Sequence, residues 1–391
     1  MSYSLYIHIP FCRRRCGYCD FNTYAGREEL LEVYVAALCR EVQWAAQAAG
    51  QRLPVGTVYF GGGTPSLLNP AQVTAVLQAI VAGFDLDCGA EVTLEANPGT
   101  LSQAGLAGLR SAGVNRLSLG MQSADAQDLR ILGRQHETGQ VLSGVRMARR
   151  AGFSSLSLDL IYGIPGQTLE RWQAGLELAL GVGVEHLSLY ALTVEDETPL
   201  AHWLRRGLLL SPDDDLAADM AEWARNRLAE AGFEHYEVSN WALGPQFRSR
   251  HNLQYWHNAP YLGLGAGAHG WAAGYRTVNE LTIEAYLARM GQTQAGEFPF
   301  GPANVVRQLV GRQTEMQETM MVGLRLIQDG VSERGFEQRF GVPLMMAFGE
   351  PIERLTRQGL LEWAGAIEDR HLRLTPRAWL IANRVFAEFV A

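Results

Sequence analysis

The chain alternates between short apolar runs and longer segments in which apolar residues recur at helical spacing. Apolar runs bounded by glycine, proline or polar residues predict strands, and apolar positions three and four apart predict helices. Strands are predicted over residues 5–9, 55–60, 91–95, 114–119, 155–160 and 184–190. Helices are predicted over 28–49, 70–81, 125–132 and 139–151, after Thr100 with Gln103 completing a capping box, and after Thr168 as a cap.

Strands that alternate with helices are typical of an α/β fold, either a parallel sheet or an open barrel of βα units. Right-handed crossovers bring the carboxyl ends of all strands to one edge, which is where ligands bind in such folds. Polar or glycine-rich stretches lie at or near these ends: the loop 12–19, the turn 61–64, Glu95, Gln122, Asp159 and Tyr190. We therefore expect a ligand site at this edge.

The second half of the chain differs in character. A helix is predicted from Ser211 as the N-cap and Pro212 as the first helical residue. Residues 359–362 and 371–375 predict a small β-wing within an otherwise helical segment. We expect an α/β domain over 1–200, a connecting region over 201–313 and a smaller helical, winged-helix-like domain over 314–391.

Composition limits the partners and the compartment. Hydrophobic residues make up 47% of the chain and charged residues only 19%, so a large core is expected. The net charge of −8 offers no general basic surface, and no nucleic-acid partner is expected. The N-terminus lacks the pattern of a signal peptide, and no apolar run approaches the ~20 residues of a membrane-spanning helix. A cytoplasmic protein is expected, and composition leaves peripheral membrane contact open.

Three of the five cysteines, Cys12, Cys16 and Cys19, stand in C-x₃-C-x₂-C spacing. Three thiolates can hold three irons of a cubane cluster and leave the fourth open to a cofactor such as S-adenosylmethionine (SAM). Two alternatives are small core residues on one helix face and a zinc site with His8 or a remote residue as fourth ligand. A proline, a glycine and three consecutive arginines oppose the helix. Polar residues at the other strand ends favour the cluster, because a zinc site does not require them.

The other residues at this edge suit a charged cofactor. The Gly61–Thr64 turn allows close approach of the backbone to a ligand, because no Cβ intervenes. Glu95 and Asp159 suit ribose hydroxyls or an ammonium group, and Arg134 suits a carboxylate. Each residue alone also fits an ordinary turn, cap or ion pair, so it is their combination that points to a cofactor site.

Six stretches carry a family resemblance: 6–12, the cysteine spacing, 61–65, 95–98, 119–123 and 159–163. They resemble the radical SAM superfamily, and more narrowly its oxygen-independent coproporphyrinogen oxidase group, over nearly the whole chain. The resemblance implies a partial (βα)₆ barrel with a [4Fe–4S] cluster on the three cysteines and Tyr18 near the adenine of SAM. It implies that further cofactor contacts come from Tyr6, Gly62, Gly63, Thr64, Glu95, Gln122, Arg134 and Asp159.

Two features sort the chain between the branches of this group. The coproporphyrinogen-oxidising branch has a longer N-terminal extension and a fourth cysteine, where this chain has Phe21. The haem-chaperone branch has Asp-Phe-Asn after the last cysteine, as at 20–22, and an H-N-x-x-Y-W motif, as at 251–256. A neutral imidazole can ligate haem iron and aromatic neighbours can cover the porphyrin, so His251 is the candidate haem ligand. A structural histidine in a turn is the other interpretation.

The resemblance thus implies a haem chaperone that delivers haem to acceptors such as membrane respiratory enzymes, with an electron donor such as flavodoxin. The alternative is an enzyme that oxidatively decarboxylates the propionates of coproporphyrinogen III in porphyrin biosynthesis. A zinc-stapled structural protein is a third interpretation. No catalytic residue is assigned, and a homodimer remains an open alternative.

Overall fold

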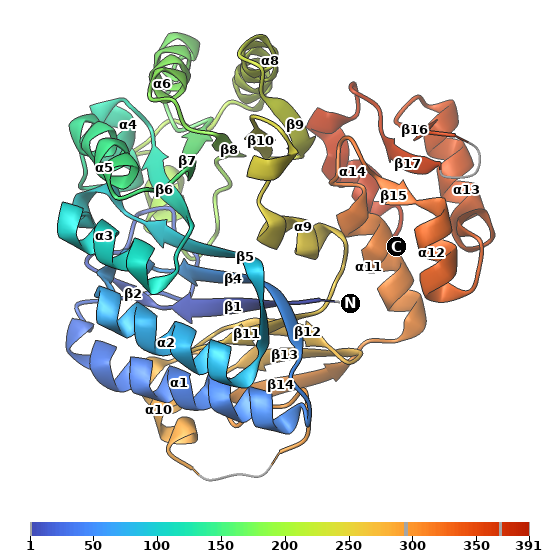
Figure 1. The fold of residues 1–391 in the computed structure, drawn as a ribbon. Coiled ribbons are helices and arrows are strands. Elements are labelled where there is room, and N and C mark those ends of the chain that lie inside the picture. Colours follow the sequence, from blue (N-terminus) through green and yellow to red (C-terminus); the bar gives the residue numbers. More distant parts are fainter. Residues whose placement is uncertain (1, 293–295, 367–369, 391) are drawn as a thin grey trace. The chain divides into compact units, whose positions relative to one another are not determined.

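The structure is a computed structural model that describes residues 2–292, 296–366 and 370–390, and it contains two compact units (Figure 1). The first unit contains residues 1–227 and 260–308, and the second contains residues 228–259 and 309–391. This division differs from the three consecutive parts predicted from the sequence, because residues 201–313 contribute to both units.

Six parallel strands in sequence order form the centre of the first unit, which confirms the predicted α/β fold. They are β1 (Tyr3–Ile9), β4 (Pro54–Gly62), β5 (Asp85–Ala96), β6 (Arg116–Gln122), β7 (Ser155–Tyr162) and β8 (His186–Ala191). Helices follow the strands and cover one face of the sheet (Figure 1). They are α1 (Leu31–Ala48), α2 (Pro70–Gly83), α3 (Gln103–Ala112), α4 (Ala126–Leu132), α5 (Thr138–Arg150), α6 (Leu169–Gly181) and α7 (Pro199–Arg205).

Between the irregularities in their register, the side chains of these strands alternate between the two faces of the sheet. In β6, Leu117 and Leu119 are buried on one face, whereas Ser118 on the other donates a hydrogen bond to Asp159 of β7. The same alternation places polar residues of all six strands on one inner face, among them Ser4, Tyr6, His8, Thr57, Tyr59, Thr93, Glu95, Ser157, His186 and Ser188. Tyr6 of β1, Glu95 of β5 and Asp159 of β7 therefore share a face as well as an edge, whereas Gln122 of β6 follows a register shift.

Four further strands extend the sheet beyond β1. Strand β11 pairs with β1 in parallel, and the next strands add in antiparallel fashion at least as far as β13. Gly263 and Gly270 permit this packing, since a Cβ on Gly263 would stand 1.8 Å from the carbonyl oxygen of His269. The elements are β11 (Tyr261–Leu264), β12 (His269–Ala272), β13 (Tyr275–Asn279), α10 (Ile283–Met290) and β14 (Asn304–Leu309). The sequence did not predict them.

The second unit is mainly helical, and its core gathers phenylalanines such as Phe336, Phe340 and Phe348. Strands β15, β17 and β16 form an antiparallel sheet, which confirms the predicted β-wing. The elements are β9 (Glu234–Glu237), β10 (Asn240–Ala242), α9 (Arg250–Trp256), α11 (Arg312–Gly323), β15 (Val331–Ser332), α12 (Glu333–Phe340), α13 (Leu344–Arg357), β16 (Leu361–Ala364), β17 (His371–Leu374) and α14 (Ala382–Ala387).

Both units also contain short 3₁₀ turns: η1 (Glu28–Leu30), η2 (Pro65–Leu67), η3 (Pro98–Thr100), η4 (Pro245–Phe247) and η5 (Trp379–Ile381). Two short strands of the first unit, β2 (Phe11–Cys12) and β3 (Tyr24–Ala25), flank the cysteine loop.

Two predicted helix starts were wrong. Helix α3 is capped by Ser102, which accepts a hydrogen bond from Gly105 N, because Thr100 belongs to η3. Helix α8 (Asp214–Glu230), which joins the two units in sequence, begins after Asp213, whose side chain accepts from Leu216 N. Among the helices of the described residues, none combines the length and apolarity needed to cross a membrane.

Candidate functional site

The cysteine loop is irregular and fixed by backbone hydrogen bonds. Gly17 N donates to the carbonyl of Leu132 at 3.0 Å, and Leu200 N donates to the carbonyl of Gly17 at 2.8 Å. A Cβ on Gly17 would stand 3.0 Å from the ring of Trp203, so this position suits glycine. Residues 13–19 are not helical, and the alternative of three core residues on one helix face is therefore wrong.

All three loop cysteines are free thiols; Cys12 is buried, and Cys16 and Cys19 are partly exposed. Thr64 Oγ1 donates to Cys12 Sγ and Arg134 Nη1 donates to Cys16 Sγ, each at 3.5 Å. Burial raises the pKa of Cys12 and of Cys19, and the negative charge of the neighbouring thiolates raises both further. Three thiols on one loop, with a hydroxyl and a guanidinium as donors, are a chemically suitable set of ligands for an iron–sulfur cluster.

The glycine turn packs directly against this loop. Gly63 N donates to the carbonyl of Ile9 at 2.9 Å, and a Cβ on Gly63 would stand 2.6 Å from the carbonyl oxygen of Phe11 and 3.0 Å from Cys12 Sγ. Gly62 has φ +112° and faces His8, so a side chain there would also be strained. The glycine turn thus makes its close contact with the cysteine loop. That the same turn binds the amino group of a methionine moiety stays a prediction.

Tyr6 and His8 begin a hydrogen-bonded chain that reaches the far end of the cysteine loop. His8 Nε2 lies 2.9 Å from the carbonyl of Asn22, so this nitrogen carries the proton. Its Nδ1 then accepts from the hydroxyl of Tyr6 at 2.9 Å. Burial lowers the pKa of His8, which keeps the imidazole neutral. Both ring nitrogens are engaged, which disfavours His8 as the fourth zinc ligand considered from the sequence.

Glu95 lies at the end of β5 and connects this strand to β4 by hydrogen bonds. Its carboxylate accepts from the Tyr59 hydroxyl at 2.7 Å and from Gly62 N at 3.3 Å. Burial raises the pKa of Glu95 to about 7, and the negative charge of Asp159 adds to the shift. The site therefore holds a carboxylate that ionises near neutrality, and a ligand cation would stabilise its charged form.

Asp159 lies on β7 and is held by serine hydroxyls from three strands. Ser118 donates at 3.0 Å and Ser157 at 3.5 Å, and Ser188 donates as well. Burial raises the pKa of Asp159 despite these hydrogen bonds. The carboxylate is thus fixed in position before any ligand arrives.

Gln122 and Arg134 meet at Gly120. A Cβ on Gly120 would stand 2.7 Å from Arg134 Nη2 and 2.8 Å from Gln122 Nε2, so a side chain there would displace the ends of both residues. The β6–β7 register shifts between Gly120 and Gln122, and Gln122 takes a left-handed φ of +63°. The bulge turns the end of β6 toward the arginine, whose Nη2 donates to the carbonyl of Gly120 at 2.8 Å.

Tyr18, expected near an adenine, lies in the same region. It packs against an apolar cluster that contains Leu132, Ile161 and Ile164. Burial raises the pKa of its phenol, and the charges of Cys16 and Asp159 raise it further. All the predicted cluster and SAM residues therefore lie in the first unit, at or beside the carboxyl ends of its parallel strands.

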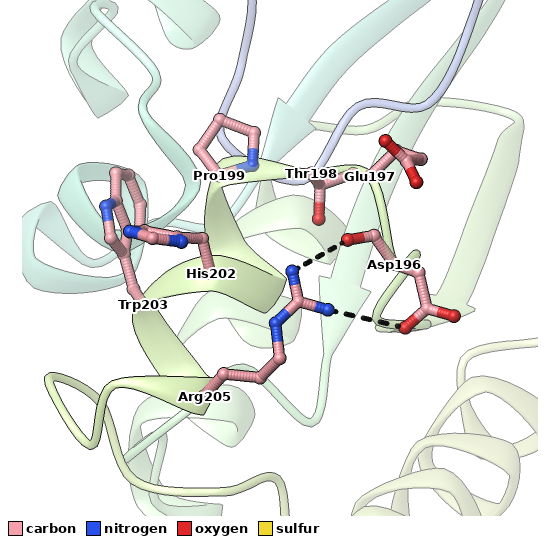
Figure 2. Close-up of a pocket in the computed structure, with 7 residues that line it drawn as sticks. All are labelled: Asp196, Glu197, Thr198, Pro199, His202, Trp203 and Arg205. Carbon is pink, nitrogen blue, oxygen red and sulfur yellow. Dashed lines mark hydrogen bonds and ion pairs between the residues drawn. The ribbon is translucent and has the colours of Figure 1, made fainter.

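Two hollows flank the cysteine loop. The smaller, of about 130 Å³, lies between Arg13, Arg14 and Arg134. The larger, of about 710 Å³, is open and lies along α7 (Figure 2). It contains none of the predicted site residues, and its Arg205 pairs with Asp196 at 3.7 Å.

His251 belongs to the second unit, on α9. Its side chain is only 1% exposed, and Nε2 forms a 2.9 Å hydrogen bond with the hydroxyl of Tyr255. The two rings meet edge to face, with centroids 5.1 Å apart. In this conformation the imidazole is packed as a structural histidine would be.

Sequence reasoning missed several residues that shape the site, mainly Tyr59, Ser118 and the linking roles of His8 and Asn22. Tyr59 and Ser118 are signalled by strand alternation, since Tyr59 lies two positions before Gly61 of the glycine turn and Ser118 lies between the buried Leu117 and Leu119. Asn22 lies outside any strand and carries no such signal.

Comparisons with known proteins agree with this geometry. The radical SAM superfamily model matches residues 6–179, and the HemN C-terminal domain model matches residues 310–381. The haem chaperone HemW of Lactococcus lactis is 37% identical over 388 residues, with 99% of this chain and 97% of that protein covered. HemW of Bacillus subtilis is 35% identical over 391 residues, with 99% of each covered.

A solved structure extends the comparison to the fold. The coproporphyrinogen III oxidase HemN of Escherichia coli aligns with a TM-score of 0.82 at 22% identity, over 99% of this chain and 90% of that one. This likeness shows the fold alone. Given also the full-length relatives, the chain belongs to the radical SAM superfamily and, within it, to the HemW family.

Proposed function

We propose that this protein is a cytoplasmic haem chaperone that binds haem and delivers it to acceptor proteins, such as respiratory enzymes, on a radical SAM scaffold. The observation that carries the proposal is the match to HemW haem chaperones along nearly the whole chain, at 35% and 37% identity. The grouping of thiols, carboxylates and Arg134 at one edge of the sheet supports the cofactor half of the proposal.

Cys12, Cys16 and Cys19 would hold a [4Fe–4S] cluster, which when reduced can supply one electron to bound SAM. Glu95 and the Gly62–Gly63 turn would receive the ammonium group of SAM, because a buried carboxylate favours a cation there. Asp159, fixed by its serine partners, would accept hydrogen bonds from ribose hydroxyls.

Five remaining residues would complete the SAM contacts. Arg134 would bind the SAM carboxylate. Its buried Nε is available for this contact, because it has no hydrogen-bond partner among the described residues. Tyr18 would pack near the adenine, and Gln122, Thr64 and Tyr6 would line the remaining walls. A protein electron donor such as flavodoxin would reduce the cluster.

His251 remains the candidate haem ligand. Ligation through Nε2 requires the Tyr255 hydroxyl to give up its hydrogen bond and the imidazole to become accessible. A buried resting histidine suits a carrier that must also release haem, since the protein contact competes with the iron.

The second candidate is oxidation of coproporphyrinogen III, which the HemN-like fold and C-terminal domain match bring into consideration. Phe21, which is 63% exposed, stands where that branch has a further cysteine. This substitution favours the chaperone.

One anaerobic preparation, reconstituted with iron and sulfide, tests both candidates. We expect a Soret shift on haem titration and no protoporphyrinogen after incubation with coproporphyrinogen III, SAM and reductant. Turnover would establish the enzyme instead. A preparation that binds zinc and takes up no iron would contradict the cluster, and an unchanged haem spectrum would contradict the chaperone.

A further inference from the structure

The small hollow beside the cysteine loop is lined by cationic, amide and hydroxyl side chains, together with the thiol of Cys16 and the imidazole of His136. Arg13 and Arg14 form its outer wall, and Arg134 lies on its inner wall with Asn97, Gln135 and Gln140. No Asp or Glu lines it among the described residues. Three guanidinium groups thus line one small hollow of a chain whose net charge is −8.

The two outer arginines are free to bind a ligand. Both are exposed, and among the described residues no carboxylate lies within ion-pair distance of either guanidinium. In contrast, Arg205 beside the other hollow is paired with Asp196. Unpaired guanidinium groups present planar forks of N–H donors, whose geometry matches a carboxylate.

The inner wall also turns donors toward the hollow. The side-chain oxygen of Gln140 accepts from Glu137 N at 2.9 Å, which leaves its amide nitrogen near Gly99. A Cβ on Gly99 would stand 3.6 Å from that nitrogen, an ordinary contact distance, so the Gln140 amide lies directly beside Gly99. Arg134 uses Nη1 and Nη2 within the protein, and its buried Nε has no partner among the described residues.

We propose that this hollow is a carboxylate-binding site and that the carboxylate it takes is a propionate of haem. The inference rests on the proposed haem-chaperone function and names the protein groups that would contact the propionate of the cargo. A volume of about 130 Å³ admits the end of a propionate but not the macrocycle, since pockets that enclose whole ligands measure roughly 300–1,000 Å³. The haem ring would therefore lie outside the hollow and remain open to an acceptor protein.

Two other sources could present a carboxylate here. SAM would use Thr64 and Arg134 from the inner side, next to Cys16. Arg13 and Arg14 lie on the exposed outer wall. An acidic side chain of an electron-donor protein could also reach that wall. The haem assignment is distinguished from both by its dependence on the propionate groups.

The test compares haem with its dimethyl ester, in which both propionates are neutral, on SAM-free reconstituted protein. We expect the ester to bind the unmodified protein about 5- to 30-fold more weakly than haem, as expected for the loss of one or two charge-assisted contacts at a solvent-exposed site. We expect Arg13→Gln/Arg14→Gln to weaken haem binding by a similar factor and to leave ester binding unchanged. Arg205→Gln is the matched control and should bind both as the unmodified protein does.

Each other outcome contradicts part of the proposal. Equal affinity for haem and ester in the unmodified protein, or equal weakening of both by the double variant, overturns the propionate site while haem binding itself stands. If the double variant weakens only the binding of an acidic flavodoxin, measured by salt-dependent co-elution, the hollow binds the electron donor and the inference is wrong. If the unmodified protein binds no haem, the proposed function fails with it. Unchanged circular dichroism and iron content in the variants ensure that folding does not explain the result.

Discussion

Arg134 Nη1 donates a hydrogen bond to the sulfur of Cys16 over 3.5 Å, while Nη2 of the same guanidinium holds the carbonyl of Gly120. One cation thus connects the cysteine loop to the end of β6. A positive charge this close to a thiolate stabilises added negative charge, and cluster reduction adds one electron.

Arg134→Gln should therefore make the reduction potential of the reconstituted cluster more negative by tens of millivolts, since 1.4 kcal/mol corresponds to about 60 mV for one electron. Redox titration followed by electron paramagnetic resonance measures the shift. Arg134→Lys keeps the positive charge, so its cluster should have a reduction potential between those of the unmodified protein and Arg134→Gln. Equal potentials for all three would show that this cation does not act on the cluster.

Cys16→Ser should abolish binding of the cubane cluster, because two remaining thiolates of the loop leave two irons without a cysteine ligand. Iron and sulfide content after anaerobic reconstitution gives the measurement. Cys88→Ser is the control, since Cys88 is an exposed thiol on β5 and should leave the cluster intact. Full iron content in the Cys16 variant would refute the assignment.

Gly63→Ala should lower the free energy of unfolding by about 1–3 kcal/mol, because its Cβ overlaps the carbonyl of Phe11 and crowds Cys12 Sγ. Urea unfolding of the cluster-free protein measures this. Gly139→Ala is a matched control on helix α5, where nothing lies within 4 Å of the new methyl group. Similar stability of the two variants would mean that the turn adjusts without cost.

The affinity for SAM should rise between pH 6 and pH 8 through Glu95. The pKa of this carboxyl is about 7, so its ionised fraction grows from about one tenth to about nine tenths across that interval. Only the ionised form attracts the ammonium group. The ratio of unmodified to Glu95→Gln affinity, measured by calorimetry, should increase with pH, because titration of SAM itself cancels in the ratio. A constant ratio would argue against this contact.

Tyr255→Phe should raise the affinity for haem, because it removes the hydroxyl that competes for His251 Nε2. His251→Ala should lower the affinity and weaken the Soret shift. His257→Ala, at an exposed neighbouring imidazole, should change neither. If His251→Ala binds haem normally but unfolds more easily, the residue is the structural histidine that the sequence also allowed.

Most parallel strands of the first unit could be predicted from the alternation of apolar and polar residues. Leu117, Leu119 and their equivalents repeat every second residue. They predict strands over 114–119 and 155–160, with Gln122 just after the first and Asp159 near the end of the second. Because parallel strands share an edge, these residues come together as expected. Features that depend only on neighbouring residues in the chain can therefore be predicted without the structure.

Other features depend on contacts between distant segments. Strands β11 to β13 were missed because glycines such as Gly263 suppress the strand pattern, although close strand packing requires them. The cap at Ser102 was missed because the competing Thr100 is also a good N-cap residue, and the η3 turn decides between them. The burial of His251 follows from tertiary packing that no motif records.

Asn22 hydrogen-bonds to His8 through its carbonyl and to the carbonyls of Ala266 and Leu281 through its side chain, at 3.1 and 2.8 Å. Residues 260–308 therefore help to hold the cysteine loop of the first unit. A truncated protein ending at Arg227 would lose these anchors and would leave β1 as a bare, sticky edge. Attempts to produce a minimal radical-SAM fragment should retain the polypeptide through β13.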